Sequence, residues 1–204
     1  MSARDDILRC ARDIYLEEGL AGMSLRKVAA CAGVSAPAIY RHFDSKEDLL
    51  WAVCEQGHEL FARYLARGLK APTALERLRQ TGFGYLAFAM EHRHYYTIMF
   101  VAPPEHLGFD DLERQNANAG SVTFQMLVDR VRECIAAGVL RDDDPEALAI
   151  AIWAYVHGLV TLYYRVPSDP KLAQLAMPAV STFERFEALY TSSLDALLAG
   201  LAPR

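Results

Sequence analysis

Apolar residues recur at intervals of three and four along almost the whole chain, and this spacing limits the possible fold more than any other feature. Such a period places apolar side chains on one side of an α-helix, whereas a half-buried strand needs strict alternation. No convincing alternating segment rich in valine or isoleucine is present. We therefore predict an all-α protein with helices over about residues 3–18, 25–31, 36–43, 46–69, 73–91, 95–100, 112–137, 146–165 and 182–198.

Two of the predicted helices are short and lie close together near the N-terminus. Ser24 and Ser35 each precede one of them, where a side-chain oxygen can accept from unpaired backbone amides. Gly33 lies between them and can take the positive φ of a tight turn. A small core can be closed by Val28, Val34, Ile39 and Phe43. Two short helices joined by a glycine-containing turn predict a helix-turn-helix motif over about residues 24–43.

The charge of this segment differs from the charge of the whole chain. The chain has a formal net charge of -5, which is unfavourable for a protein that must neutralise phosphates. Within residues 24–46, Asp44 is the single acidic residue, and it is opposed by Arg26, Lys27, Arg41 and Lys46. A locally basic segment in an acidic chain is compatible with DNA binding at that segment.

Three runs in this region form a recognisable signature. They are Val28-Ala29, Ala32-Gly-Val-Ser35 and above all Ile39-Tyr-Arg-His-Phe-Asp-Ser-Lys-Glu-Asp-Leu49. Together they resemble the N-terminal signature of the tetracycline-repressor (TetR) family, over about residues 7–50. The resemblance implies a transcription repressor whose second short helix enters the DNA major groove while flanking residues hold phosphates.

The resemblance also assigns candidate DNA-binding residues by position. Ser24 and nearby amides would meet a phosphate at a helix N-terminus, and Tyr40, His42 and Lys46 would contact the DNA backbone. Base edges would face the residues from Ser35 to Ala38, with Arg41 nearby; the alanines and proline there offer only apolar contacts, for example to thymine methyl groups. The full predicted set is Ser24, Arg26, Lys27, Ser35, Ala36, Pro37, Ala38, Tyr40, Arg41, His42 and Lys46.

We expect a DNA-binding domain over residues 1–48 and a larger ligand-binding and dimerisation domain over residues 49–204. One short recognition helix makes too few contacts for tight binding of operator DNA, so a homodimer is expected. The last two long helices suit its interface. The helix over 146–165 has small residues that allow close packing: Ala147, Ala151, Ala154 and Gly158. The helix over 182–198 has an apolar stripe: Phe186, Leu189, Tyr190, Leu194 and Leu197.

Aromatic residues are concentrated in the predicted larger domain. Aromatic walls with a few polar tips suit a small apolar or aromatic effector, although most of these residues could instead be core. The candidate ligand-binding residues are Tyr85, Phe88, Tyr95, Tyr96, Phe100, Phe124, Trp153 and His157. The run Trp153-Ala-Tyr-Val-His157-Gly158 resembles a pattern found in one subgroup of such regulators. His157 could contact the effector, but a hydrogen-bonded core histidine is the favoured interpretation.

The four cysteines, Cys10, Cys31, Cys54 and Cys134, are scattered singly without a Cys-x-x-Cys pair. This spacing suggests neither a disulfide framework nor a zinc site, and small buried core residues are expected. A redox sensor is disfavoured because no cysteine has an evident resolving partner and because Cys31 is expected on a packed helix face. Neither a metal nor a cofactor is predicted.

An alternative function is a small all-α enzyme or binding protein that uses the aromatic cavity. His92, His94 or His157 with Glu91 could then act as acid and base, but the chain lacks a nucleophile motif, a phosphate loop and a cofactor fingerprint. The apolar runs 148–156 and 159–164 are expected to form a buried helix rather than a membrane span. The charged N-terminal residues argue against a secretory signal, so a cytoplasmic protein is expected.

Overall fold

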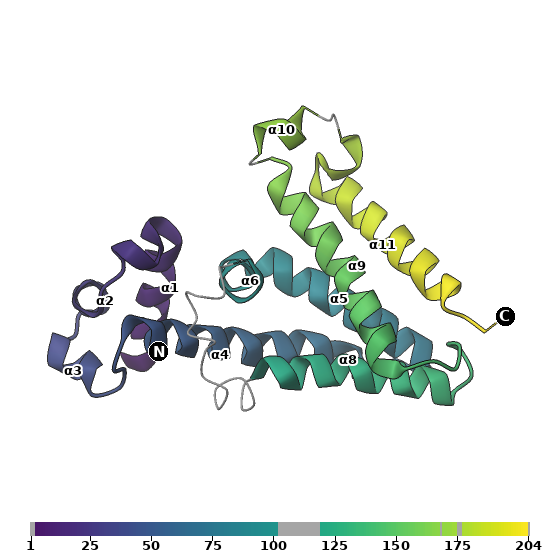
Figure 1. The fold of residues 1–204 in the computed structure, drawn as a ribbon, viewed down its shortest axis with the longest axis horizontal. Coiled ribbons are helices and arrows are strands. Elements are labelled where there is room, and N and C mark those ends of the chain that lie inside the picture. Colours follow the sequence, from purple (N-terminus) through teal and green to yellow (C-terminus); the bar gives the residue numbers. More distant parts are fainter. Residues whose placement is uncertain (1–2, 102–118, 168, 175–176, 204) are drawn as a thin grey trace. The chain divides into compact units, whose positions relative to one another are not determined.

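A computed structural model describes residues 3–101, 119–167, 169–174 and 177–203, and within these ranges the chain is helical without strands (Figure 1). This confirms the predicted all-α fold. The helices are α1 (Ala3–Gly22), α2 (Leu25–Ala32), α3 (Ala36–Tyr40), α4 (Lys46–Leu65), α5 (Ala74–Glu91), α6 (Arg93–Phe100), α8 (Ala119–Ala136), α9 (Pro145–Arg165), α10 (Pro170–Ala173) and α11 (Phe183–Gly200), with 3-10 turns η1 (Ala66–Lys70) and η3 (Pro178–Val180).

The described residues fall into two compact units. The first unit lies within Met1–Ala62 and Phe88–Val122, and the second within Arg63–Ala87 and Thr123–Arg204. The predicted DNA-binding segment, residues 1–48, lies inside the first unit. The division of the chain into domains at residue 48 stays a prediction.

The first unit is built around α1, which contacts both α2 and α6. Its fully buried side chains include Leu8, Val28, Ile39, Leu49 and Leu50. Burial of one such side chain stabilises the fold by roughly 1.5–3 kcal/mol relative to leaving it exposed. The core therefore takes one side of each short helix and leaves the other side in solvent.

Two helix ends in the first unit differ from the predicted ends. The prediction ended the first helix before Gly19, and this residue has φ 68° and ψ -177°, which interrupts the helix. One further turn follows it, so that α1 ends at Gly22. α3 ends at Tyr40 rather than Phe43, because the amides of both His42 and Phe43 turn back to the carbonyl oxygen of Ile39.

The second unit contains α9 and α11, which pack against each other (Figure 1). The Tyr190 hydroxyl on α11 donates to the carbonyl oxygen of Gly82 on α5 at 2.7 Å, in a buried position. A Cβ at Gly82 would lie 2.7 Å from a methyl carbon of Leu194, so the glycine permits α11 to approach α5 closely. Phe186 stacks on Tyr163 of α9 with ring centroids 4.3 Å apart.

Local capping sets the starts of the long helices in this unit. Asp144 accepts from the amide of Glu146 at 3.0 Å, and Thr182 accepts from the amide of Arg185 at 3.4 Å. Both are predicted starts. The predicted helix over 112–137 is seen from Ala119, and its first residues, 112–118, lie outside the described residues.

The prediction that α9 is buried is wrong for the single chain. α9 is long and apolar enough to cross a membrane by length and composition, yet only 28% of its most apolar window is buried. Leu148, Ala149, Ile152, Val156 and Val160 pack inward. Between these positions α9 leaves other apolar side chains exposed, namely Ile150, Trp153, Tyr155 and Leu162.

Candidate DNA-binding and effector sites

The start of α2 is organised by Ser24. Its backbone is extended, and its Oγ accepts from the amide of Lys27 at 3.2 Å. This is the N-cap predicted from the sequence. A hydroxyl that accepts one hydrogen bond can still donate, so exposed Ser24 keeps a donor that could reach a phosphate.

The turn between α2 and α3 depends on Gly33. This residue caps α2 in the left-handed conformation, with φ 67°, and the amide of Val34 bonds to the carbonyl oxygen of Ala29 at 3.0 Å. A side chain would be strained at this φ even though no atom lies within 4 Å of the position that a Cβ would take. The predicted glycine turn is confirmed.

The short α3 presents its N-terminal residues to solvent. Ser35 and Pro37 are exposed, Ala36 and Ala38 are half-buried, and Ile39 is fully buried. The Ser35 side chain makes no capping bond, in contrast to that of Ser24. Its hydroxyl is therefore not used to cap the helix and is available to contact a DNA base.

Exposed polar and aromatic groups follow at the end of α3. Tyr40 is 53% exposed, while Phe43 is only 5% exposed and belongs to the core. Arg41 and His42 are exposed as well. A large aromatic side chain with a hydroxyl, standing in solvent beside basic residues, is suited to contact a polar partner.

α4 begins at Lys46, directly after this exposed group. The Oγ of Ser45 accepts from the amide of Asp48 at 3.0 Å, and the Asp48 carboxylate accepts from the amide of Asp44 at 3.3 Å. This is a capping box whose return bond comes from the amide of Asp44 rather than from that of Ser45. It fixes the position of Lys46, which is half-buried, at the helix N-terminus.

Not every predicted basic contact is equally available. Lys27 forms an ion pair with Glu18 and donates to the carbonyl oxygen of Gly22 at 3.2 Å. Arg26 is exposed. To contact DNA, Lys27 would have to exchange the Glu18 carboxylate for a phosphate. Arg26 could contact a phosphate without breaking that ion pair.

The cysteine prediction is wrong for two of the four residues. Cys10 on α1 and Cys31 on α2 form a disulfide bond, with their Cα atoms 5.9 Å apart. Cys31 is exposed rather than packed. The spacing in the sequence could not show this pairing, because the two residues are 21 positions apart and meet only when the helices pack. Cys54 and Cys134 are free and buried, as predicted.

The predicted effector residues divide between the two units. In the first unit, the ring centroid of Phe61 lies 4.8 Å from that of Phe88 and 5.8 Å from that of Phe100, and Tyr96 packs against Phe100. Tyr95 lies on the same helix as Tyr96 and donates to Gln56 at 2.6 Å. The prediction missed His58, which contacts Phe100 edge-on; burial lowers its pKa to about 4, so it is neutral at pH 7.

In the second unit, Tyr85, Phe124, Trp153 and His157 come together. The Tyr85 hydroxyl and Nδ1 of His157 are 2.9 Å apart, and Nε2 of His157 lies 3.4 Å from the Thr161 hydroxyl. The Trp153 ring contacts the rings of Phe124 and His157, each at a centroid distance of 6.1 Å. Burial lowers the pKa of His157, which favours the neutral ring.

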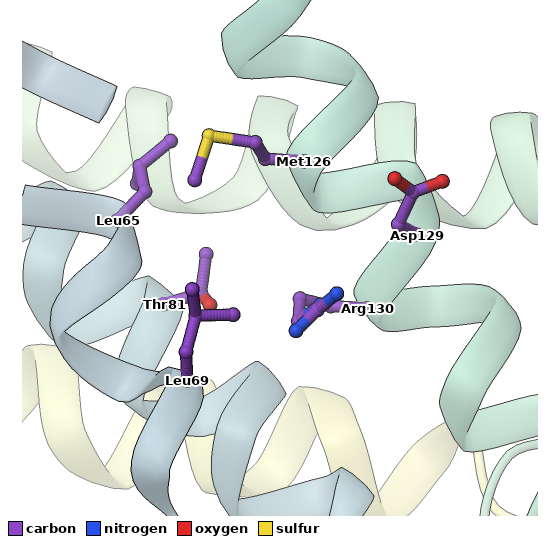
Figure 2. Close-up of a pocket in the computed structure, with 6 residues that line it drawn as sticks. All are labelled: Leu65, Leu69, Thr81, Met126, Asp129 and Arg130. Carbon is purple, nitrogen blue, oxygen red and sulfur yellow. The ribbon is translucent and has the colours of Figure 1, made fainter. Parts of the chain in front are cut away.

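A cavity of about 120 Å³ also lies in the second unit. Leu65, Leu69 and Thr81 face Met126 and Arg130 across it, with Asp129 at its edge (Figure 2). Arg130 pairs with Glu133 at 2.8 Å. Among the described residues, its Nε is the buried side-chain polar atom without a hydrogen-bond partner. The sequence prediction included none of these lining residues, although Thr81 lies one helical turn before Tyr85.

Known protein families match both the helix-turn-helix segment and the larger C-terminal part of the chain. Residues 7–53 match the profile described as bacterial regulatory proteins of the tetR family, and residues 78–175 match that of the tetracyclin repressor-like C-terminal domain. The transcriptional repressor KstR2 of Mycolicibacterium smegmatis is 32% identical over 148 residues, which are 70% of this chain and 69% of the relative. The chain belongs to the TetR family.

A second TetR-family relative is the repressor KstR2 of Mycobacterium tuberculosis. It is 31% identical over 181 residues, which are 85% of this chain and 86% of the relative. Its solved structure, described as a ketosteroid transcriptional regulator, has a TM-score of 0.63 at 18% identity and covers 100% of this chain and 96% of that one. A protein of unknown function from Rhodococcus sp. RHA1 has a TM-score of 0.76 at 26% identity, with 100% and 97% coverage.

These comparisons confirm the predicted family and fold. They do not test the individual DNA-binding and effector residues, which stay predictions. The subgroup suggested by Trp153, His157 and Gly158 stays a prediction as well.

Proposed function

We propose that this TetR-family member is a cytoplasmic, homodimeric repressor that binds operator DNA and is released by a small apolar effector. The observation that supports this most is the surface of α3. Its buried Ile39 anchors the helix, while Ser35, Pro37 and Tyr40 are exposed on a unit whose fold is a helix-turn-helix. Such a unit binds in the major groove with its recognition helix.

The exposed apolar residues of α9 support the dimer. Ile150, Tyr155 and Leu162 are each between 40% and 53% exposed in the single chain. An apolar patch of this kind on a soluble monomer marks an interaction surface. If a second copy covers it, the two recognition helices can be spaced for successive major grooves, as operator binding requires.

Effector binding is supported by the second unit. The Tyr85–His157 pair supplies polar groups among aromatic side chains. The cavity in the same unit is lined by Arg130, whose buried Nε has no partner among the described residues. An apolar compound with an acceptor oxygen, such as a ketone, would satisfy that donor. The description of the M. tuberculosis relative as a ketosteroid regulator makes steroid ketones a reasonable first class to test.

We propose no catalytic role. Among the described residues, no group of three or more histidine, cysteine, aspartate or glutamate side chains could hold a metal. Glu91 ends α5, and His92 and His94 lie at the start of α6; all three, which the enzyme alternative would use, are at least partly exposed. Tyr85 and His157 suit binding, since a neutral, hydrogen-bonded imidazole can orient a ligand without chemistry.

The decisive experiment measures the affinity of the protein for DNA from its own upstream region by fluorescence anisotropy. The Kd should rise by about 1000-fold between roughly 50 and 200 mM salt if about six phosphates are contacted. Tyr40→Ala should weaken specific and non-specific DNA alike, by about tenfold. Ser35→Ala should change the preference among operator variants. A salt-independent Kd, or no binding to any upstream fragment, would overturn the proposal.

A further inference from the structure

The Cys10–Cys31 bridge connects the two helices that carry the DNA-binding unit. Cys10 is fully buried in the middle of α1, and Cys31 is exposed in the last turn of α2. Their Cα separation of 5.9 Å lies within the usual range for a disulfide. Gly33, which forms the turn into α3, is two residues after Cys31. The bridge therefore ties α1 to the end of α2 that immediately precedes the recognition helix.

The other two cysteines are unsuited to this chemistry. Cys54 and Cys134 are buried, and burial raises the pKa of the Cys54 thiol to about 12 and that of the Cys134 thiol to about 11. The thiolate is the form that reacts with oxidants, so both should stay reduced at neutral pH. Cys31 combines solvent access with a second sulfur within bonding reach.

We propose that Cys10 and Cys31 are a reversible thiol–disulfide pair through which a peroxide increases operator affinity. The effect of the pair on operator affinity rests on the proposed repressor function. The reversible formation of the disulfide does not depend on it. Disulfides in cytosolic proteins are usually transient and redox-sensing or catalytic rather than permanent. A disulfide that joins an exposed residue to a buried one, beside the turn into α3, fits the redox-sensing class.

The oxidation proceeds in two balanced steps. The Cys31 thiolate attacks one oxygen of hydrogen peroxide, which breaks the O–O bond, forms a sulfenic acid and releases the other oxygen as water. The Cys10 sulfur then attacks the Cys31 sulfur, forming the S–S bond and expelling the sulfenic hydroxyl as a second water. Two thiols lose two electrons to one peroxide. A dithiol reverses the change by exchange and leaves as a cyclic disulfide.

The bridge acts on DNA binding through preorganisation. In the reduced form, α2 is held against α1 by packing and by the Lys27–Glu18 ion pair, both of which tolerate small shifts. In the bridged form, the last turn of α2 cannot move away from α1, so less motion is lost when α3 binds DNA. We expect the bridged form to bind operator about three- to tenfold more tightly.

The first test is chemical and does not involve DNA. The purified full chain is treated with hydrogen peroxide or with dithiothreitol, desalted and denatured, and its thiols are counted. The reduced protein should show four thiols and the oxidised protein two, with the Cys10 and Cys31 peptides linked in a non-reducing digest. Four thiols after peroxide, or a link to Cys54 or Cys134, would overturn the pair.

The second test compares stability. The bridge closes a loop of 21 residues, and it should raise the melting temperature by about 6–12 °C. Cys31→Ser, at an exposed position, should remove this difference, whereas the control Cys54→Ala should keep it. Equal melting temperatures for oxidised and reduced wild type would contradict a bridge at this place.

The third test measures operator affinity in both redox states. Wild type should bind more tightly after peroxide, and Cys31→Ser should have one affinity under both conditions. Equal wild-type affinities, with the bridge demonstrated by mass spectrometry, would overturn the regulatory claim. If neither form binds upstream DNA while the bridge forms, the repressor function fails and the thiol–disulfide pair stands.

Discussion

Arg130 shows how a single residue can suggest the chemistry of an effector. Its side chain is only 17% exposed, and Glu133 neutralises its charge at 2.8 Å. Arg130 lines the cavity, and its buried Nε has no hydrogen-bond partner among the described residues. A buried donor of a charged group that lacks an acceptor loses free energy on the order of 1–3 kcal/mol or more, and an effector oxygen in the cavity would recover it.

We predict that Arg130→Met removes the preference for effectors with an acceptor oxygen. Methionine keeps an apolar stem but has no N–H donor, so the Kd of a ketone should rise by about tenfold or more. The hydrocarbon analogue without the oxygen should bind both proteins equally. Isothermal titration calorimetry measures both ligands. Arg132→Met is the matched control, because Arg132 on the same helix is 49% exposed and does not line the cavity; a ketone loss in that variant as well would contradict the assignment.

Residues whose roles are local could be predicted from the sequence. Ser24, Asp144 and Thr182 cap helices through atoms two or three residues away, and Gly33 is required by its own φ. The Cys10–Cys31 bridge could not be predicted in this way. It depends on the angle at which α1 and α2 pack, and no local pattern encodes that angle.

The same distinction holds for whole helices. Periodicity identified α9 to within one residue of its start, but an apolar pattern alone cannot show whether a helix is covered by its own chain or by another. The expectation of a buried helix therefore failed at exposed residues such as Ile150 and Leu162. The apolar pattern also could not predict helix ends that are set by individual turns, such as the early end of α3 at Tyr40.

We predict that Ile150→Asp separates the dimer. Ile150 is 53% exposed in the single chain, and a charge placed in an apolar interface would be buried without a partner. The dimer dissociation constant should rise at least about tenfold, which sedimentation velocity at micromolar protein concentration would detect. Val122→Asp is the control, because Val122 is 58% exposed on α8 and an acidic residue is tolerated near a helix N-terminus.

If Ile150→Asp leaves the dimer unchanged, α9 is not the interface. If Val122→Asp dissociates the dimer to the same extent, the effect of the charge is not specific to α9. A monomeric Ile150→Asp protein should also lose most of its operator affinity, because one recognition helix alone makes too few contacts.

At the scale of the whole molecule, release from the operator requires that the effector and DNA favour different conformations. The coupling must then be reciprocal: if a steroid ketone raises the operator Kd by some factor, operator DNA must raise the Kd of that ketone by the same factor. We predict a factor between about 5 and 150. Anisotropy with labelled operator gives one value, and calorimetry with and without saturating operator gives the other. A ketone that binds with one Kd in both calorimetric titrations would be a ligand without a regulatory effect, and the repressor would then need a different effector.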